Sequence, residues 1–154
     1  MDYYNKIAPG YNELYGEEQR KKLEAIKKYL FLKPADKILD VGCGTGISSG
    51  FENFTVGIDT SFELLKDNGG INVQGKAEYL PFKDSSFDAV VCITAIHHFN
   101  AEKALSEMQR VGKNHFAISV LRKSINFDAI RNMIKEFFPM IKSVVHEKDI
   151  LFIL

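Results

Sequence analysis

Short apolar segments alternate with amphipathic ones along the chain, and this alternation predicts the order of the structural elements. Apolar runs typical of buried strands span residues 37–41, 54–58, 71–74, 87–93 and 116–121. The run F-D-A-V-V-C-I at 87–93 is nearly continuous, as expected for a strand that is buried on both faces. A last apolar stretch, V-V-H-E-K-D-I-L-F-I-L, predicts a closing hairpin with a polar turn at Glu147 to Asp149.

Between these runs, apolar residues recur at helical spacing. Residues 17–30 place Leu23, Ile26 and Leu30 on one face and charged side chains on the other, residues 101–111 are also expected to be helical, and residues 125–138 carry a stripe of apolar side chains. Strands that alternate with helices favour an α/β fold. We therefore expect a doubly wound, mostly parallel sheet with an antiparallel edge at its end.

Composition narrows the class of protein. At 154 residues, with 45% hydrophobic and 26% charged residues, the chain suits one globular domain. A net charge of zero argues against a general polyanion binder, which would carry a basic surplus. Only two cysteines are present, so a disulfide framework or a zinc site is not expected. The N-terminus lacks an apolar signal region and no apolar run is long enough to span a bilayer, so we expect a cytoplasmic location and no membrane contact.

Candidate chemistry is concentrated after the first predicted strand, where residues 38–46 are I-L-D-V-G-C-G-T-G. Alternating glycines at 42, 44 and 46 allow a ligand to approach the backbone closely. A dinucleotide fingerprint would be G-x-G-x-x-G, and a phosphate-binding loop would continue with Gly-Lys-Ser/Thr, which is absent. Asp40, two residues before the first glycine, would repel a diphosphate. It suits a ligand with an ammonium group, such as S-adenosylmethionine, whose ribose hydroxyls a carboxylate at Asp59 can accept.

Each of these residues also has a purely structural interpretation. Asp40 could cap the amides of the turn, and Asp59 could be the N-cap of a helix beginning at T-S-F-E-L-L. His97 and His98 at a strand-to-helix junction are more typical of packed or hydrogen-bonded structure than of a metal site. Cys43 and Cys92 are expected to behave as small apolar side chains rather than as nucleophiles. No metal site is predicted.

In four motifs the chain resembles the class I S-adenosylmethionine-dependent methyltransferases, and in particular the methyltransferase type 11 group that includes ubiquinone/menaquinone C-methyltransferases. The motifs, in the family's order, are I-L-D-V-G-C-G-T-G, G-I-D-T-S, G-K-A-E-Y-L-P-F and F-D-A-V-V-C-I-T-A-I-H-H-F. The resemblance covers roughly residues 1–122. It implies a Rossmann-like, seven-stranded, mostly parallel sheet with an antiparallel C-terminal hairpin, in a minimal version. It also implies one domain over 1–154: a lid and helix (1–33), a cofactor-binding core (34–122) and a C-terminal helix and hairpin (123–154).

The resemblance further implies which residues hold S-adenosylmethionine or its product S-adenosylhomocysteine. The glycine turn should hold the methionine part, Asp59 and Thr60 the ribose, Ala77 and Glu78 the adenine, and Ile93 and Thr94 should border the methyl donor. The segment Y-Y-N-K-I-A-P-G-Y looks like the family's lid, whose aromatic residues close over the cofactor. The full predicted set is Tyr3, Tyr11, Asp40, Gly42, Cys43, Gly44, Gly46, Asp59, Thr60, Ala77, Glu78, Ile93 and Thr94.

The sequence departs from the family pattern at several places. Lys76 stands where an aspartate usually accepts the adenine amino group, and a lysine cannot accept a hydrogen bond. The segment between Gly46 and Asp59 is about one helical turn short, so its crossover helix should be a stub at I-S-S-G-F-E. The segment after Asp59 is also short, with Gly69 and Gly70 leaving little room for a helix. An insertion that commonly covers the substrate after the fifth strand is missing, so an open substrate side is expected.

The predicted activity is methyl transfer by in-line SN2 displacement, in which the protein aligns the reactants and excludes water. No catalytic base can be named. The acceptor is a small molecule, a tRNA or a protein, and an activating partner subunit or a homodimer would complete so short a core. Two other interpretations stay open: a non-catalytic S-adenosylmethionine-binding subunit that acts with a partner, and a dinucleotide-dependent oxidoreductase.

Overall fold

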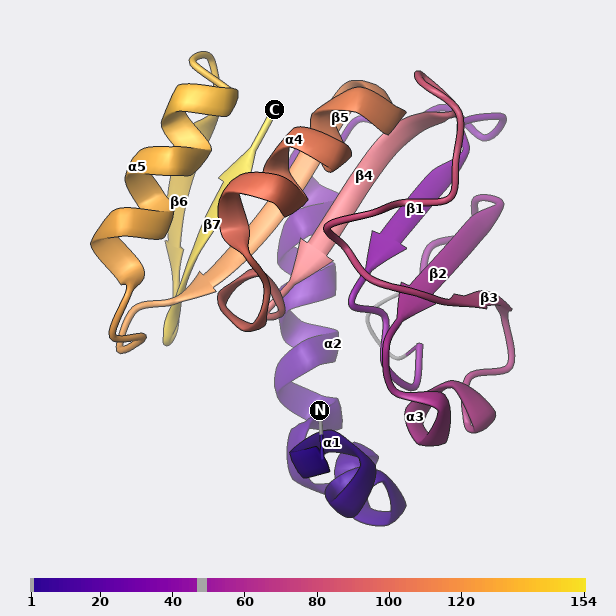
Figure 1. The fold of residues 1–154 in the computed structure, drawn as a ribbon. Coiled ribbons are helices and arrows are strands. Elements are labelled where there is room, and N and C mark those ends of the chain that lie inside the picture. The colour runs from indigo at the N-terminus through magenta and orange to yellow at the C-terminus, as the bar shows by residue number, and fades with distance from the viewer. Residues whose placement is uncertain (1, 47–49) are drawn as a thin grey trace.

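A computed structural model describes residues 2–46 and 50–154 of the chain and contains a seven-stranded sheet (Figure 1). The strand order is β3-β2-β1-β4-β5-β7-β6. The strands are β1 (Ile38–Val41), β2 (Thr55–Asp59), β3 (Ile71–Gln74), β4 (Phe87–Ile93), β5 (Gly112–Leu121), β6 (Lys142–His146) and β7 (Asp149–Ile153). The first five strands are parallel, whereas β7 runs antiparallel to both β5 and β6. The predicted Rossmann-like sheet with an antiparallel C-terminal hairpin is confirmed.

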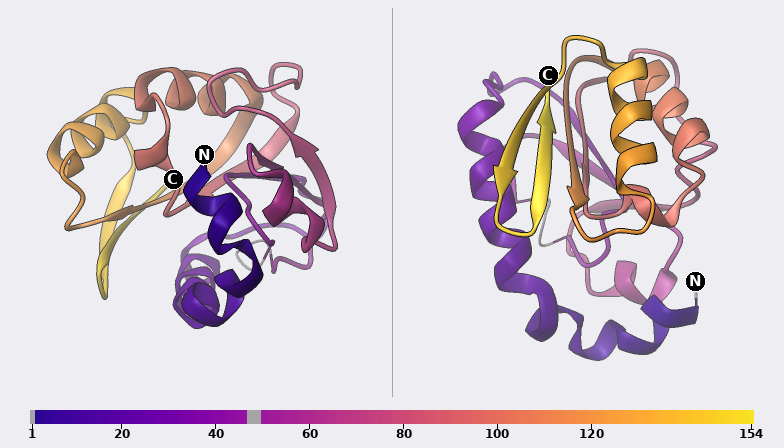
Figure 2. Two further views of the ribbon diagram at one scale, coloured as in Figure 1. Left: turned by 60° about the horizontal axis from the view of Figure 1, so that its bottom comes forward. Right: turned by 90° about the vertical axis from the view of Figure 1, so that its left-hand side faces the viewer.

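Helices pack on both faces of this sheet (Figure 2). They are α1 (Asp2–Ile7), α2 (Tyr11–Tyr29), α3 (Phe62–Lys66), α4 (Ala101–Val111) and α5 (Phe127–Phe137). α2 buries Leu23 and Ile26 against strand residues such as Val91 and Ala117, in one apolar cluster. The other cluster lies under α4 and α5, where Leu105 and Ile134 are fully buried. Each face of the central strands is therefore covered, as the apolar run of β4 predicts.

The α2 side of β2 and β3 differs, because its side chains are polar or absent. Val56 and Ile58 point into the core under α4, which leaves Gly57 and its β3 neighbour Asn72 on the opposite face. No helix is present in residues 50–54 of the first crossover, and the rest of the expected stub, residues 47–49, lies outside the described part of the chain. α3 has only five residues, which agrees with the short segment after Asp59.

Several element boundaries differ from the prediction. α2 begins at Tyr11 rather than at residue 17. β5 begins at Gly112 rather than at Phe116, because the polar residues 113–115 hide the apolar period. The polar turn of the hairpin is confirmed at Glu147, which has φ +50°, but Asp149 already belongs to β7. Within the described residues, no helix is both long and apolar enough to cross a bilayer.

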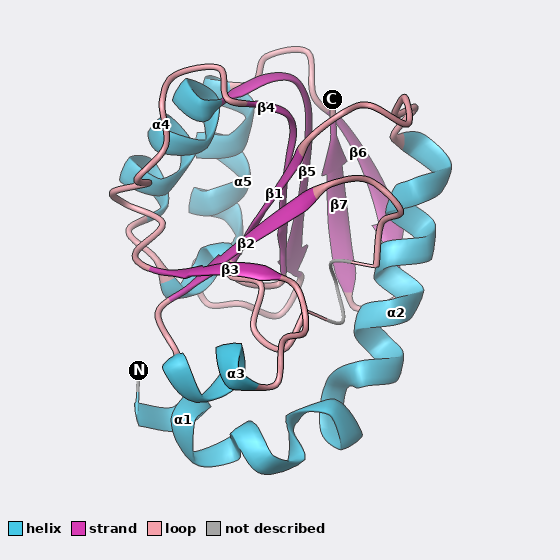
Figure 3. Cartoon of the chain, turned by 90° about the vertical axis from the view of Figure 1, so that its right-hand side faces the viewer, coloured by secondary structure: helices cyan, strands magenta, loops and turns pink. Residues whose placement is uncertain are grey.

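The carboxyl ends of the parallel strands meet at one edge of the sheet, which we call the carboxyl edge. α1 and α3 lie beside this edge and contact each other (Figure 3). Ligands of doubly wound sheets bind outside the carboxyl ends of the strands, where the strand order reverses direction. Here that reversal lies between β1 and β4.

Candidate functional site

The glycine turn after β1 has the backbone that its sequence predicts. Gly42, Gly44 and Gly46 have φ values of +76°, +52° and +81°. The amides of Gly42 and Cys43 both donate to the carbonyl oxygen of Ile58, at 2.8 and 3.2 Å, which ties the turn to the end of β2. A Cβ on Gly42 would lie 2.5 Å from the Cβ of Ala95, so no larger residue fits there.

Asp59, the last residue of β2, is held by the same turn. Its Oδ2 accepts the amide of Gly44 at 2.9 Å, and its Oδ1 accepts the amide of Ser61 at 2.8 Å. Each carboxylate oxygen retains further lone-pair capacity, since a carboxylate accepts up to about four hydrogen bonds. The side chain is thereby fixed in one orientation and can still accept further hydrogen bonds from a ligand.

The structural alternative for Asp59 does not describe the turn. The N-cap of α3 is Ser61, whose Oγ accepts a hydrogen bond from the amide of Leu64 at 3.3 Å, so Asp59 is not the helix cap. The amides of Gly42 and Cys43 donate to Ile58, and the amide of Gly44 donates to Asp59. Asp40 itself is fully buried in β1.

A cavity of about 70 Å³ opens at the carboxyl edge between the glycine turn, β2, β4 and the start of α2. Seven of the predicted residues line it: Tyr11, Gly42, Gly44, Asp59, Thr60, Ile93 and Thr94. Four further residues complete the wall: Leu64, Ala95, His98 and Phe99. The cavity is small beside typical ligand pockets of roughly 300–1,000 Å³. A nucleoside-sized ligand would therefore need the N-terminal segment to shift or would lie partly outside.

Other predicted residues lie around this cavity without lining it. Tyr3 is 56% exposed, and its hydroxyl pairs with that of Tyr15 at 3.3 Å. Gly46 borders a separate hollow beside Asn68 and Asn72. Ala77 is buried, whereas Oε1 of Glu78 accepts the amide of Asn100 at 2.8 Å.

Burial keeps the Tyr11 hydroxyl and the Cys43 thiol protonated. Burial, followed by the charge of Asp59, raises the pKa of Tyr11 to about 12. Burial, followed by the charges of Asp40 and Asp59, raises the pKa of the Cys43 thiol far above its usual range. A protonated, buried thiol is a poor nucleophile, as the sequence predicts.

The histidine pair lies on a single helical turn beyond β4, with ring centroids 4.0 Å apart. Burial, with the neighbouring His98 as a second cause, lowers the pKa of His97 to about 4. Burial also lowers the pKa of His98, which lines the cavity. Across residues 2–46 and 50–154, no group of three or more His, Cys, Asp and Glu side chains is placed to hold a metal ion.

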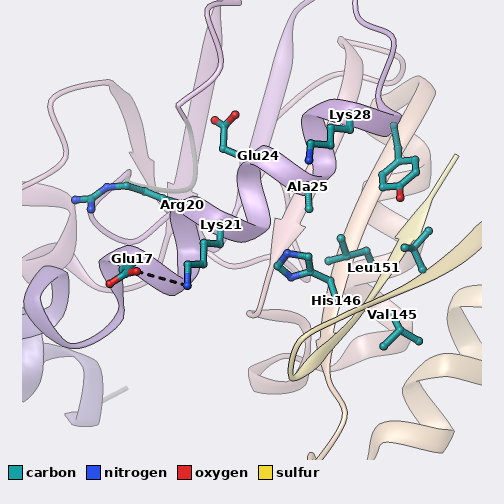
Figure 4. A pocket seen from close by; sticks show the side chains of 11 residues that line it. Glu17, Arg20, Lys21, Glu24, Ala25, Lys28, Val145, His146 and Leu151 are labelled. Atoms are coloured by element: carbon teal, nitrogen blue, oxygen red, sulfur yellow. Dashed lines mark ion pairs between the residues drawn. The ribbon is translucent and has the colours of Figure 1, made fainter.

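Larger hollows lie elsewhere on the surface, and one of about 190 Å³ borders Gly46 of the glycine turn. A groove of about 550 Å³ runs between α2 and the β6–β7 hairpin (Figure 4). Its wall mixes charged α2 side chains, including the Glu17–Lys21 pair at 3.5 Å, with Leu151 and the exposed Val145 of the hairpin. The smaller cavity is the better candidate site, because it alone combines the glycine turn with a fixed carboxylate.

Sequence reasoning missed three apolar members of the cavity wall. Leu64 is buried on the short helix α3, and Ala95 and Phe99 flank the histidine pair. The contact between Ala95 and Gly42 could have been suspected only from the pairing of β1 with β4, which joins their carboxyl ends. Nothing in the periodicity of the chain marks Phe99 as a wall residue.

Comparison with known proteins relates this chain to one family and one type of fold. The model of the methyltransferase domain family matches residues 39–118. An uncharacterized protein of Methanocaldococcus jannaschii is 33% identical over 96% of this chain and 61% of its own length. The probable tRNA methyltransferase 9B of Homo sapiens is 33% identical over 70% of this chain and 25% of its own length. The chain thus spans less than two thirds of these curated relatives.

A solved structure adds a comparison of folds. A methyltransferase of Haloferax volcanii, solved in a complex with the Trm112 methyltransferase activator, has a TM-score of 0.77 and 16% sequence identity, over 92% of this chain and 77% of that one. At this identity the likeness shows the fold alone. Solved S-adenosylmethionine-dependent methyltransferases share the same fold.

Proposed function

Since the chain belongs to the class I S-adenosylmethionine-dependent methyltransferase family, we propose that it transfers a methyl group from this cofactor to an acceptor at the carboxyl edge. The observation that carries the proposal is the joint geometry of the glycine turn and Asp59. Positive φ values open the backbone at Gly42 and Gly44, and the Gly44 amide orients the Asp59 carboxylate.

The described residues fit the cofactor that the family and fold imply. Asp59 would accept both ribose hydroxyls, and Thr60 lies beside it on the cavity wall. The backbone of the glycine turn would follow the methionine part, with the charge of the buried Asp40 close by. Ala77 and Glu78 would flank the adenine, and Tyr3 and Tyr11 would cover the nucleoside. Cys43 and Gly46 would contact the methionine part with the rest of the glycine turn, and Ile93 and Thr94 would border the methyl donor.

When bound, S-adenosylmethionine supplies an already activated methyl group. The residues of this chain therefore have to orient two molecules and exclude water. Tyr11 and Phe99 form apolar walls of the cavity, and Tyr11 keeps its proton at neutral pH because its pKa is raised to about 12. Neither Cys43 nor Cys92 supplies a thiolate, since burial raises both thiol pKa values. The proposed chemistry is alignment for in-line displacement without a protein nucleophile.

For the acceptor we propose a tRNA, with a partner subunit that supplies part of the RNA contact. The similarity to a probable tRNA methyltransferase and the fold shared with an activator-bound methyltransferase support this choice. Net charge is zero, so unaided binding to a polyanion would be weak. Basic residues Arg122 and Lys123 follow β5 at the carboxyl edge, beside Lys148, whose carbonyl accepts the Arg122 amide at 2.9 Å. Lys113 and His115 lie at the opposite end of β5 and cannot join them.

A label-transfer assay tests the proposal. The protein is incubated with methyl-labelled S-adenosylmethionine and three separate pools, namely unfractionated tRNA, total protein and small-molecule extract, with and without a Trm112-type activator. Label in the tRNA pool, strengthened by the activator and abolished by Asp59→Ala, is the expected result. Label confined to protein or small molecules would refute the tRNA acceptor, and no label in any pool would refute methyl transfer itself.

A further inference from the structure

A buried lysine links helix α2 to the wall of the cavity. Lys22 is only 1% exposed, and its ammonium nitrogen has three acceptors. These are Oε1 of Glu18 at 2.9 Å, Oδ2 of Asp149 at 2.8 Å and Oγ1 of Thr94 at 2.8 Å. The contacts with Glu18 and Thr94 are hydrogen bonds and the contact with Asp149 is an ion pair, so Lys22 is held from three sides.

The charges around this lysine cancel. Lys148 pairs with the second carboxylate oxygen of Glu18 at 3.2 Å, and Asp149 is fully buried against Lys22. Two lysines and two carboxylates thus form one neutral cluster. A buried ion pair is weak evidence for stability, because desolvation offsets most of the attraction between the charges. What the cluster does provide is a fixed hydrogen-bond donor directed at Thr94.

The hydroxyl of Thr94 is also held from the other side, by Ser119 of β5. Oγ of Ser119 accepts the amide of Thr94 at 2.7 Å and lies 3.1 Å from Oγ1 of Thr94. Ser119 is fully buried, and within the described chain Oγ1 of Thr94 is the acceptor available to its proton. Since a buried hydroxyl proton is costly to leave unpaired, Ser119 donates to Thr94.

It follows that Oγ1 of Thr94 accepts two hydrogen bonds, one from Lys22 and one from Ser119. A hydroxyl oxygen has two lone pairs, so both are used and its own proton needs another acceptor. Thr94 lines the cavity, so a molecule bound there could supply the acceptor for this proton. The hydroxyl is a donor of fixed direction.

The backbone of Thr94 is a second observation that marks the same residue. Its φ is +53°, a left-handed conformation that is rare for a β-branched side chain. Such strain costs about 1–3 kcal/mol and collects at sites where a residue must be held in one orientation. The Ser119 bond to the Thr94 amide and the Lys22 bond to its hydroxyl together fix this strained conformation.

We infer that the Thr94 hydroxyl donates a hydrogen bond to a carbonyl oxygen of the methyl acceptor, and that Lys22 is the positioning residue that orients it. This inference rests on the proposed methyl transfer. Strand β1 separates β4 from β2, so Thr94 lies roughly 10 Å along the edge from Asp59 and the ribose it would hold. We choose a carbonyl because its oxygen accepts this proton and brings no proton of its own that would need a further partner.

The test compares Thr94→Val, which removes the hydroxyl at constant shape, with Thr94→Ser, which keeps it. In the label-transfer assay with unfractionated tRNA, Thr94→Val should lower kcat/KM at least about tenfold, whereas Thr94→Ser stays within about threefold of wild type. Because Thr94 also borders the proposed cofactor site, calorimetry with S-adenosylhomocysteine should show a loss of affinity for Thr94→Val that is well below the tenfold loss in kcat/KM. The neutral pair Lys22→Met/Asp149→Asn should lower kcat/KM to a similar extent, and adding Thr94→Val to it should cause no further loss.

Full activity of Thr94→Val would overturn this inference and leave the proposed methyl transfer standing. So would an equal loss of S-adenosylhomocysteine affinity, because the hydroxyl would then serve the cofactor. Additive losses in the triple variant would remove Lys22 from the positioning role. If wild-type protein labels none of the three pools, the proposed function fails first and the inference fails with it.

Discussion

Asp59 carries the most specific expectation at the scale of a single residue. Its carboxylate is already oriented by two amides and borders the cavity. Asp59→Ala should therefore weaken S-adenosylhomocysteine binding at least about tenfold, or about 1.4 kcal/mol, through the loss of two charge-assisted hydrogen bonds. Isothermal calorimetry measures this loss of affinity, and Asp67→Ala, at the exposed end of α3, is a control that should bind normally. An unchanged dissociation constant in a folded Asp59→Ala protein would contradict the ribose role.

Gly42 allows a second prediction with its own control. Gly42→Ala forces a Cβ to within 2.5 Å of the Ala95 Cβ at φ +76°. We expect a loss of about 1–3 kcal/mol in the free energy of unfolding, together with loss of cofactor binding. Gly10→Ala meets nothing within 4 Å and should leave both properties close to wild type. Urea denaturation compares the two, and equal stabilities would show that the turn can relax.

At the scale of elements, the apolar contact between α2 and β7 contains one buried ion pair. Lys22→Met alone leaves the fully buried Asp149 without its countercharge, which should cost about 3–5 kcal/mol of unfolding free energy. Lys22→Met/Asp149→Asn removes both charges and should recover most of that loss. Urea denaturation midpoints compare the stability of the single variant with that of the double variant. A single variant as stable as the double variant would mean that solvent or Lys148 reaches Asp149.

Whether a segment is a helix or a strand could be predicted from the sequence more readily than where it ends or which side chains it contacts. The apolar run of β4 and the stripe of α5 appear where the period predicts them. Gly112 to His115 of β5 escaped prediction, because polar residues at a strand end carry no apolar period. From the sequence, Lys22 would be predicted to lie on the solvated face of its helix. Its ammonium group is buried because it pairs with Asp149, which lies more than a hundred residues later in the chain.

The candidate site was predictable to the extent that motifs mark it. Residues of the glycine turn and Asp59 came from a sequence pattern with a physical reason, namely close backbone approach and a carboxylate at a strand end. Ala95, Leu64 and Phe99 join the wall through tertiary packing alone. Such contacts depend on how β1 and β4 align, and no local signal encodes that register.

At the scale of the whole molecule, stability should depend on the protonation of His97. Its pKa is lowered to about 4 by burial, whereas in the unfolded chain it titrates near 6.5. The unfolded state therefore binds more protons between these values, and stability present above pH 6.5 is lost as the pH falls toward 4. His97→Asn should lose less stability than wild type between pH 7 and pH 5 in urea denaturation. His115→Asn, which removes an imidazole elsewhere on the sheet, is the control. If wild type, His97→Asn and His115→Asn lose the same unfolding free energy between pH 7 and pH 5, groups other than His97 cause the acid sensitivity.

The order of strands in the sheet has a consequence for synthesis of the protein on the ribosome. β6 is translated before β7, yet it pairs only with β7, which also forms the antiparallel pair with β5. Until residues 149–153 emerge, β6 has no neighbour, the edge of β5 stays open, and Lys22 has no buried countercharge. A nascent chain that stalls before this point would expose an unpaired strand edge, the kind of feature that invites aggregation. The emergence of β7 therefore completes the pairing of both β5 and β6 at this end of the sheet.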